Sequence, residues 1–307
     1  MPSIKLGTRG SALALWQAEW VKTLLQSRHP DLHVALIIIK TQGDKILDVP
    51  LAKVGGKGLF VKELEEALLA EEIDLAVHSM KDMPAVVPDG LQLAAILERE
   101  DPRDVLLSIR HATLTALPQG AVVGSSSLRR QSQLLHLRPD LRVLSLRGNV
   151  NTRIGKLEAG LFDAILLAAA GVKRLQLTQH VVEYLDPEVM IPANGQGAIG
   201  IETRQQDTRT LSLVAPLNHR PTWQCVSAER AFLATLEGGC QVPIAGYAQR
   251  HADTLQLLGR VSSLDGTEML TQRLQGSAEQ PVALGERLAQ ELLDRGARRI
   301  LESISCV

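Results

Sequence analysis

One stretch, residues 73–84, constrains the fold more than any other part of the chain. Its first half, Ile73 to Val77, is an apolar run with β-branched residues, which is typical of a short buried strand. Its second half turns polar within five residues: His78, Ser79, Lys81 and Asp82. In open α/β sheets, ligands bind beyond the carboxyl ends of the strands, so this pattern predicts a polar site at a strand end. From these residues alone, a solvated turn with a surface ion pair is the alternative.

The same alternation of apolar strand and polar strand end recurs before this stretch. Residues 4–7 predict a first strand, and Ala12 to Gln26 predict an amphipathic helix with Ser11 as its N-cap. Arg9 and Ser11 then lie at a helix N-terminus, where backbone N–H groups favour anions. Val34 to Lys40 is a nearly continuous apolar run, as in a parallel sheet covered on both faces. This alternation of predicted strands and helices indicates an α/β lobe.

Residues 51–60 form a glycine-rich basic loop that contains Lys53 and Lys57 and ends at Phe60. It is not a nucleotide-binding P-loop, because Gly58 rather than Ser or Thr follows its second lysine. The loop is interpreted as a lid over an anionic ligand, with a mobile surface loop as the alternative.

A second α/β rhythm follows a charged, proline-containing break at residues 98–103. Three strand ends there carry arginine beside small or hydroxyl residues at a predicted helix start. The basic and hydroxyl candidates are Ser127, Arg129, Arg130, Arg147, Arg153 and Arg174. Together with Arg9 and Lys81, they predict a basic cleft for a polyanion.

The order of the segments predicts three domains. Residues 191–198 are a second flexible stretch, after which residues 199–202 could return a strand to the first lobe. Two crossings between two α/β lobes resemble the hinged architecture of type II periplasmic binding proteins. After Leu217 a helix, three strands and a final helix predict a small α+β domain. The expected boundaries are 1–98 with 198–217, then 99–197, then 218–307.

Composition narrows the possible partners. The chain has 307 residues, a net charge of −1 and 3% aromatic residues, which argues against nucleic-acid binding. Three cysteines without metal-type spacing predict free thiols in a reducing compartment and no metal site. No stretch approaches the length of a membrane span, and no exposed apolar repeat indicates a partner. We therefore expect a cytoplasmic monomer.

Cys240 stands in an unusual context, with two glycines before it and Pro243 after it. Such a loop is exposed and kinked, which suits a reactive or modified thiol. A structural cysteine remains the alternative on this context alone.

Taken together, these segments resemble the porphobilinogen deaminase (hydroxymethylbilane synthase) family of tetrapyrrole biosynthesis. The matching stretches cover the chain from end to end in the family's order. They are residues 8–14, 54–60, 77–84, 124–130, 146–149, 192–197 and the run 229–245 around Cys240.

The resemblance implies a transferase that joins four porphobilinogen molecules head to tail, with loss of ammonia at each addition. It implies one covalent dipyrromethane cofactor per chain, attached through a thioether to Cys240. Asp82 would be the catalytic carboxylate. It would stabilise the pyrrole cation that remains when ammonia departs, and it would transfer protons to and from the reacting groups. The resemblance also implies three groups of site residues. The cofactor would be bound by Lys81, Asp82, Ser127, Arg129 and Arg130, and the substrate by Arg9, Ser11, Arg147, Arg153 and Arg174. The mobile loop would contribute Lys53, Lys57 and Phe60.

The chief rival is a non-enzymatic, hinged binding protein for a small anion. It explains the arginines and both crossings, but neither the Cys240 loop nor the third domain. A nucleic-acid binder is the third possibility, and the neutral charge disfavours it.

Overall fold

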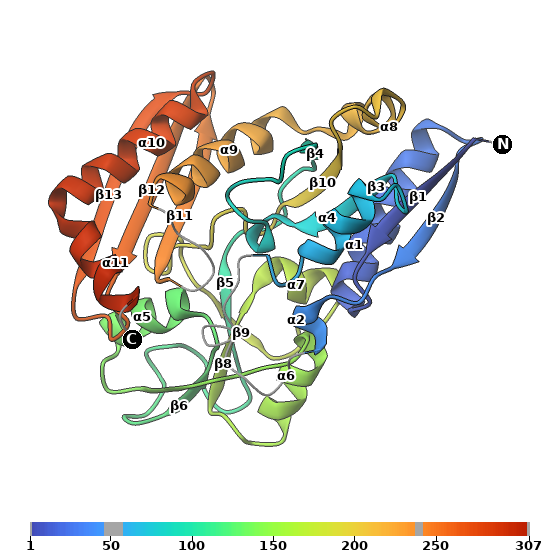
Figure 1. Ribbon diagram of the computed structural model, residues 1–307. Coiled ribbons are helices and arrows are strands. Elements are labelled where there is room, and N and C mark those ends of the chain that lie inside the picture. Colours follow the sequence, from blue (N-terminus) through green and yellow to red (C-terminus); the bar gives the residue numbers. More distant parts are fainter. Residues whose placement is uncertain (1, 46–57, 237–241, 306–307) are drawn as a thin grey trace. The chain divides into compact units, whose positions relative to one another are not determined.

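The strands form three sheets in the computed structural model, which describes residues 2–45, 58–236 and 242–305 (Figure 1). The chain divides into two compact units. The described part of the first comprises residues 2–45, 58–100 and 198–223, and that of the second comprises residues 101–197 and 224–305 except 237–241. Each unit is considered by itself.

The first unit is built on a five-stranded sheet in the order β2-β1-β3-β10-β4. The strands are β1 (Ser3–Thr8), β2 (His33–Ile38), β3 (Leu75–Ser79), β4 (Leu91–Ile96) and β10 (Ile199–Arg204). β1 runs parallel to β2 and β3, whereas β10 is antiparallel to both β3 and β4. The strand that returns from the second unit therefore lies inside the sheet of the first, next to β3.

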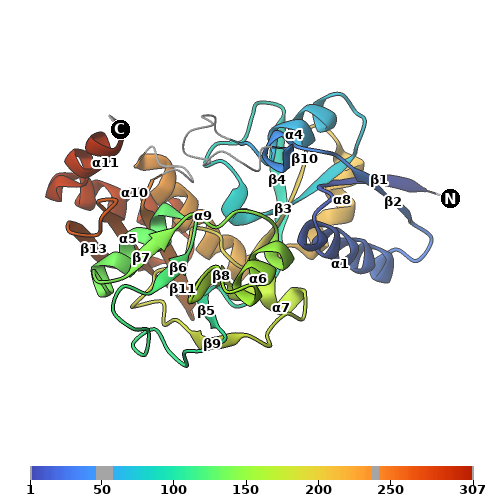
Figure 2. The same cartoon turned by 90° about the horizontal axis from the view of Figure 1, so that it is seen from below.

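Helices cover both faces of this sheet. Leu75 and Val77 pack with α1 (Ala12–Arg28), whereas Ala76 packs with α4 (Lys62–Leu69). Because successive strand residues point to opposite faces, β3 is buried on both sides and reads as a continuous apolar run. Figure 2 shows α1 and α4 on opposite sides of the sheet. Shorter helices are α2 (Gln42–Lys45), the 3₁₀ turn Met80–Asp82, α8 (Thr208–Val214) and the 3₁₀ turn Ala215–Leu217.

The second unit repeats this strand order in its own sheet, β7-β6-β8-β5-β9. The strands are β5 (Asp104–Ser108), β6 (Val122–Gly124), β7 (Arg142–Leu144), β8 (Ala164–Ala168) and β9 (Val181–Tyr184). Here β5, which follows the first crossing, is the antiparallel strand beside β8. One hydrophobic cluster includes Leu134 of α5 (Leu128–Leu137), and another includes residues of α6 (Val150–Glu158) and α7 (Ala169–Arg174).

A three-stranded antiparallel sheet completes the second unit. Its strands are β11 (Ile244–His251), β12 (Thr254–Ser262) and β13 (Met269–Ser277), and its helices are α9 (Arg220–Thr235), α10 (Pro281–Leu292), the π turn Leu293–Ala297 and α11 (Arg298–Ser305). Phe232 of α9 and Leu288 of α10 share one core with Leu257 of β12. Ile191 packs against Ala245 and Leu258, which joins this sheet to the preceding lobe.

The predicted fold class is confirmed: two α/β lobes with two crossings, and a small α+β region at the C-terminus. The exact boundaries of three domains stay a prediction. One element differs from expectation, since β3 begins at Leu75 and continues through His78 and Ser79. The cause is pairing with β10, where Ile199 opposes Ser79. In the described part of the chain, no helix is long and apolar enough to cross a membrane.

Candidate active site

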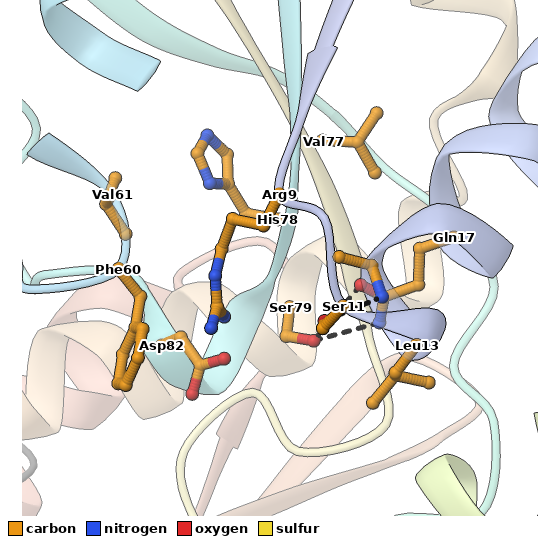
Figure 3. A pocket seen from close by; sticks show the side chains of 11 residues that line it. Arg9, Ser11, Leu13, Gln17, Phe60, Val61, Val77, His78, Ser79 and Asp82 are labelled. Atoms are coloured by element: carbon orange, nitrogen blue, oxygen red, sulfur yellow. Dashed lines mark hydrogen bonds between the residues drawn. The ribbon is translucent and has the colours of Figure 1, made fainter. Parts of the chain in front are cut away.

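A small cavity of about 50 Å³ lies at the carboxyl edge of the first unit's sheet (Figure 3). Its walls come from the ends of β1 and β3 and from the N-terminal ends of α1 and α4. The lining residues are Arg9, Ser11, Leu13, Ala14, Gln17, Phe60, Val61, Val77, His78, Ser79 and Asp82. The strand-end site predicted from residues 73–84 therefore exists, with residues of four elements around it.

Asp82 reaches this cavity because the strand turns sharply after Ser79. Met80 N–H donates to the Ala198 carbonyl at 3.0 Å, and the chain then forms the 3₁₀ turn Met80–Asp82. Ser79 is tied to α1 by a 2.8 Å hydrogen bond from the Gln17 amide. Asp82 is half-buried and lines the cavity, whereas Lys81, also half-buried, is not among its lining residues.

Arg9 is held in place by two neighbours. Its guanidinium donates to both carboxylate oxygens of Asp44, at 2.5 and 3.2 Å, and lies 4.2 Å from the centre of the Phe60 ring. The Phe60 ring packs so closely on Gly43 that a Cβ there would overlap it. Figure 3 shows the Arg9 guanidinium pointing into the same part of the cavity as Asp82. A cation is thus presented beside the candidate carboxylate.

Two opposing effects set the pKa of Asp44. Burial raises it, but hydrogen bonds and charge attraction from Arg9, with a hydrogen bond from the Thr41 hydroxyl, outweigh burial. The net pKa lies below its ordinary value, so Asp44 is ionised at neutral pH and Arg9 keeps its partner.

The second unit brings most of the other predicted cations to one sheet edge. β6, β7 and β8 run parallel, and each is followed at its carboxyl end by a helix start. Ser127 caps α5 by accepting from Arg130 N–H, and Asn149 caps α6 by accepting from Thr152 N–H. Ser127, Arg129, Arg130, Arg147 and Arg153 lie on the connections that follow β6 and β7 or in the first turn of the next helix, whereas Arg174 is the last residue of α7. This edge collects positive charge and helix N-termini, which suits a ligand with several carboxylates.

Arg129 and Arg130 are both buried, and both pair with Asp104. Asp104 is fully buried, and its oxygens accept from Arg129 at 2.7 Å, from Arg130 at 2.8 Å and from Gln196 at 2.9 Å. Burial raises the pKa of Asp104, but the two guanidinium charges outweigh it and hold the pKa well below its usual range. One carboxylate against two guanidinium groups leaves a net positive charge in this cluster.

Two of the remaining arginines are anchored through backbone carbonyls. Arg153 donates to Gly148 O and Arg174 donates to Gly197 O, each at 2.8 Å. Arg147 is half-buried, and this burial lowers its pKa. Hydrogen bonds to fixed carbonyls hold the Arg153 and Arg174 side chains in place.

The structure thus brings Arg9, Ser11, Phe60 and Asp82 together. It places Ser127, Arg129, Arg130, Arg147 and Arg153 at the carboxyl edge of the second unit's sheet, and Arg174 at the C-terminal end of α7. Lys53, Lys57 and Cys240 lie outside the described residues. Sequence reasoning missed Asp44, Asp104 and Gln17. The only indication of Asp104 in the sequence is its position at the start of a short apolar run, directly after the charged break at residues 98–103. Among the described residues, no group of three or more His, Cys, Asp or Glu side chains could hold a metal ion.

Comparison with known proteins gives close relatives over the whole chain. The family model "Porphobilinogen deaminase, dipyromethane cofactor binding domain" matches residues 4–212, and "Porphobilinogen deaminase, C-terminal domain" matches residues 223–294. Porphobilinogen deaminase of Syntrophotalea carbinolica is 56% identical over 98% of this chain and 96% of its own length. That of Pelobacter propionicus is 56% identical over 98% and 97%.

Solved structures with a partial likeness have low identity. The periplasmic VFT2 domain of Bordetella pertussis BvgS has a TM-score of 0.42 at 16% identity, covering 70% of this chain and 86% of that one. A TRAP solute-binding protein of Desulfovibrio salexigens has a TM-score of 0.44 at 11% identity, covering 71% and 72%.

Proposed function

Because the chain belongs to the porphobilinogen deaminase family, we propose that Asp82 is its catalytic acid and base. The chain therefore catalyses the reaction of this family. It is a transferase that joins four porphobilinogen molecules into the linear tetrapyrrole hydroxymethylbilane, with loss of ammonia at each addition.

The position of Asp82 supports this role. Departure of ammonia from the aminomethyl group of porphobilinogen leaves a positive charge on the pyrrole. A fixed carboxylate near the pyrrole N–H stabilises that charge and accepts or returns protons. Asp82 is a half-buried carboxylate at the end of β3 and lines the cavity with Arg9 and Ser11. This placement is the observation that carries the proposal.

The basic groups at the two sheet edges would bind the acidic side chains of the pyrroles. Every pyrrole ring of the substrate carries an acetate and a propionate, so a growing chain gains negative charge at each step. Arg9 and Ser11 of the first unit, with Arg147, Arg153 and Arg174 of the second, are proposed for the substrate. Lys81, Ser127, Arg129 and Arg130 are proposed for the cofactor, and Lys53, Lys57 and Phe60 for the loop that covers the site.

The dipyrromethane cofactor supplies the primer to which the substrate units are added, and we propose that Cys240 attaches it. The net positive charge of the Asp104 cluster and the capped N-termini of α5 and α6 fit a group with several carboxylates. Intact mass and peptide mapping test the attachment. A mass excess of two porphobilinogen units less two ammonia should map to Cys240 and be absent from Cys240→Ser. The same excess on Cys240→Ser would place the attachment elsewhere.

The catalytic proposal is tested with Asp82→Asn, which removes the charge at nearly constant shape. Turnover, followed as ammonia release, should fall by about 100-fold or more, because general acid–base groups contribute about 10² to 10⁴. Asp89→Asn is the matched control, since Asp89 is exposed on the same unit. Near-normal turnover of Asp82→Asn would remove Asp82 from the reaction.

We propose that the protein is a cytoplasmic monomer without nucleic-acid partners, which fits its net charge of −1 and the free thiol of Cys225. Light scattering after size exclusion, at the concentration used for assays, should give the mass of one chain, 33.3 kDa.

A further inference from the structure

Behind the cavity, three ionisable side chains are buried together. His78 lines the cavity, yet its ring points away from Asp82 in Figure 3. Its Nε2 lies 3.0 Å from Glu202 Oε2, and the two side chains are 2% and 0% exposed. Glu65 of α4 is also buried and lies close enough for the charges of Glu202 and His78 to act on it. We call these residues the His78 cluster.

The hydrogen bonding of the cluster is incomplete, which is rare for buried polar atoms. Within the described part of the chain, neither Oε1 of Glu202 nor Oε1 of Glu65 has a hydrogen-bond partner. A buried carboxylate without full hydrogen bonding costs stability. Because nothing in the fold of the lobe demands three ionisable groups here, the cost indicates a role in function.

The cluster joins β3 and α4, which line the cavity, to β10, which pairs with β3. His78 stands on β3 four residues before Asp82, Glu202 stands on β10, and Glu65 lies one turn after Val61 at the start of α4. The pairing register of β10 with β4 shifts between Ile201 and Glu202. Such irregularities re-aim side chains and are frequent beside active sites.

We propose that Glu202 and Glu65 are positioning residues, which act through His78 on the end of β3 and so fix the orientation of Asp82. The proposal rests on the catalytic role proposed for Asp82. The ion pair or hydrogen bond of Glu202 with His78 ties β3 to β10 immediately before the turn. A misplacement of about 1 Å at a reacting group can cost about 100-fold in rate, so this tie matters for turnover.

Glu65 makes the tie sensitive to pH. Burial, together with repulsion from Glu202, raises the pKa of Glu65 to about 7, against an opposing effect of His78. Below that pH Glu65 is neutral, whereas above it Glu65 adds a buried negative charge beside His78 and Glu202. The ionisable groups on the elements packed against Glu65 are Lys62, Glu63 and Glu66 of α4, His78 of β3, and Glu202 and Arg204 of β10, while β4 has none.

The test measures kcat, KM and cofactor loading of the holoenzyme for Glu202→Gln, which removes the carboxylate charge and so weakens the link between Glu202 and His78 at nearly constant shape. We expect kcat to fall about tenfold or more with KM within about twofold, and intact mass to show full cofactor loading. Glu19→Gln, an exposed carboxylate on α1 with a 58% exposed side chain, is the charge-matched control. A kcat within about twofold of wild type would overturn the proposal, as would lowered stability with unchanged kcat.

Glu65→Gln gives a second readout and keeps the test open if Glu202→Gln does not fold. The ratio of wild-type kcat to Glu65→Gln kcat should fall as pH rises through about 7, because only the wild type gains the buried charge. A ratio constant from pH 6 to 8.5 would contradict the role of Glu65. Asp82→Asn is assayed in parallel: if it loses turnover while both cluster variants keep it, the cluster proposal alone fails.

Discussion

At the scale of single residues, Asp104 is the carboxylate on which the second unit depends most. It is fully buried between Arg129 and Arg130 and also accepts from Gln196. Asp104→Asn would leave two buried guanidinium groups facing each other without a counter-charge. Breaking a buried pair in this way costs about 3–5 kcal/mol. Urea unfolding at pH 7 should show this loss.

The control for Asp104 is an exposed ion pair in the same unit. Glu188 pairs with Arg273, and the two side chains are 57% and 42% exposed. Glu188→Gln should change the free energy of unfolding by less than about 1 kcal/mol. Equal effects of Asp104→Asn and Glu188→Gln would mean that the Asp104 cluster carries no special stability.

The cavity-lining residues could be predicted from the sequence more readily than their partners. Arg9 and Asp82 follow apolar strands directly, so their position at a sheet edge could be read from local pattern. Asp44 and Glu202 act on residues 35 and 124 positions away, at Arg9 and His78. Nothing local marks such a pairing, because it exists only once the sheet order is fixed.

At the scale of elements, the packing of α4 on β3 and β10 depends on the protonation of Glu65. The pKa of Glu65 is raised from 4.5 to about 7, so the folded state binds this proton more tightly than the unfolded chain does. The contribution of protonated Glu65 to the free energy of unfolding is therefore complete below pH 4.5 and is lost as pH rises through about 7. Relative to Glu65→Gln, the wild type should lose on the order of 2 kcal/mol between pH 5 and 8.

Urea unfolding of both proteins across this pH range measures the difference directly. Titrating groups that do not interact with Glu65 affect wild type and variant alike, so their contributions cancel. Parallel curves for the two proteins would show that Glu65 has the same affinity for protons in the folded and unfolded states.

The boundaries of helices and strands could be predicted where the local sequence pattern alone determines them. Ser11 caps α1 as expected, and the three strands predicted after Leu217 are β11, β12 and β13. β5 and β9 were not predicted, because they are short antiparallel strands whose partners lie far along the chain. The end of β3 was placed too early for the same reason, since β10 extends it from more than a hundred residues away.

At the scale of the whole molecule, the C-terminal sheet belongs to the same compact unit as the second lobe. Glu229 of α9 accepts from Gly195 N–H at 2.6 Å and from Ala248 N–H at 2.8 Å. Arg260 of β12 donates to Gln133 of α5 at 2.8 Å. These bonds join segments that the sequence pattern had assigned to separate domains, and no local periodicity records them.

This sharing predicts how the second unit opens. Amides of β6 and β12 should exchange through one common opening, because foldons coincide with units that share a core and hydrogen bonds. Arg260→Met removes the guanidinium but keeps the apolar stem, so it should lower the opening free energy of β6 and β12 together. The expected loss is about 1–2 kcal/mol, and β1 in the first unit should keep its own value. Native-state hydrogen exchange with mass spectrometry resolves all three strands. A loss confined to β12 would mean that the C-terminal sheet folds as an independent domain, as the sequence pattern alone suggested.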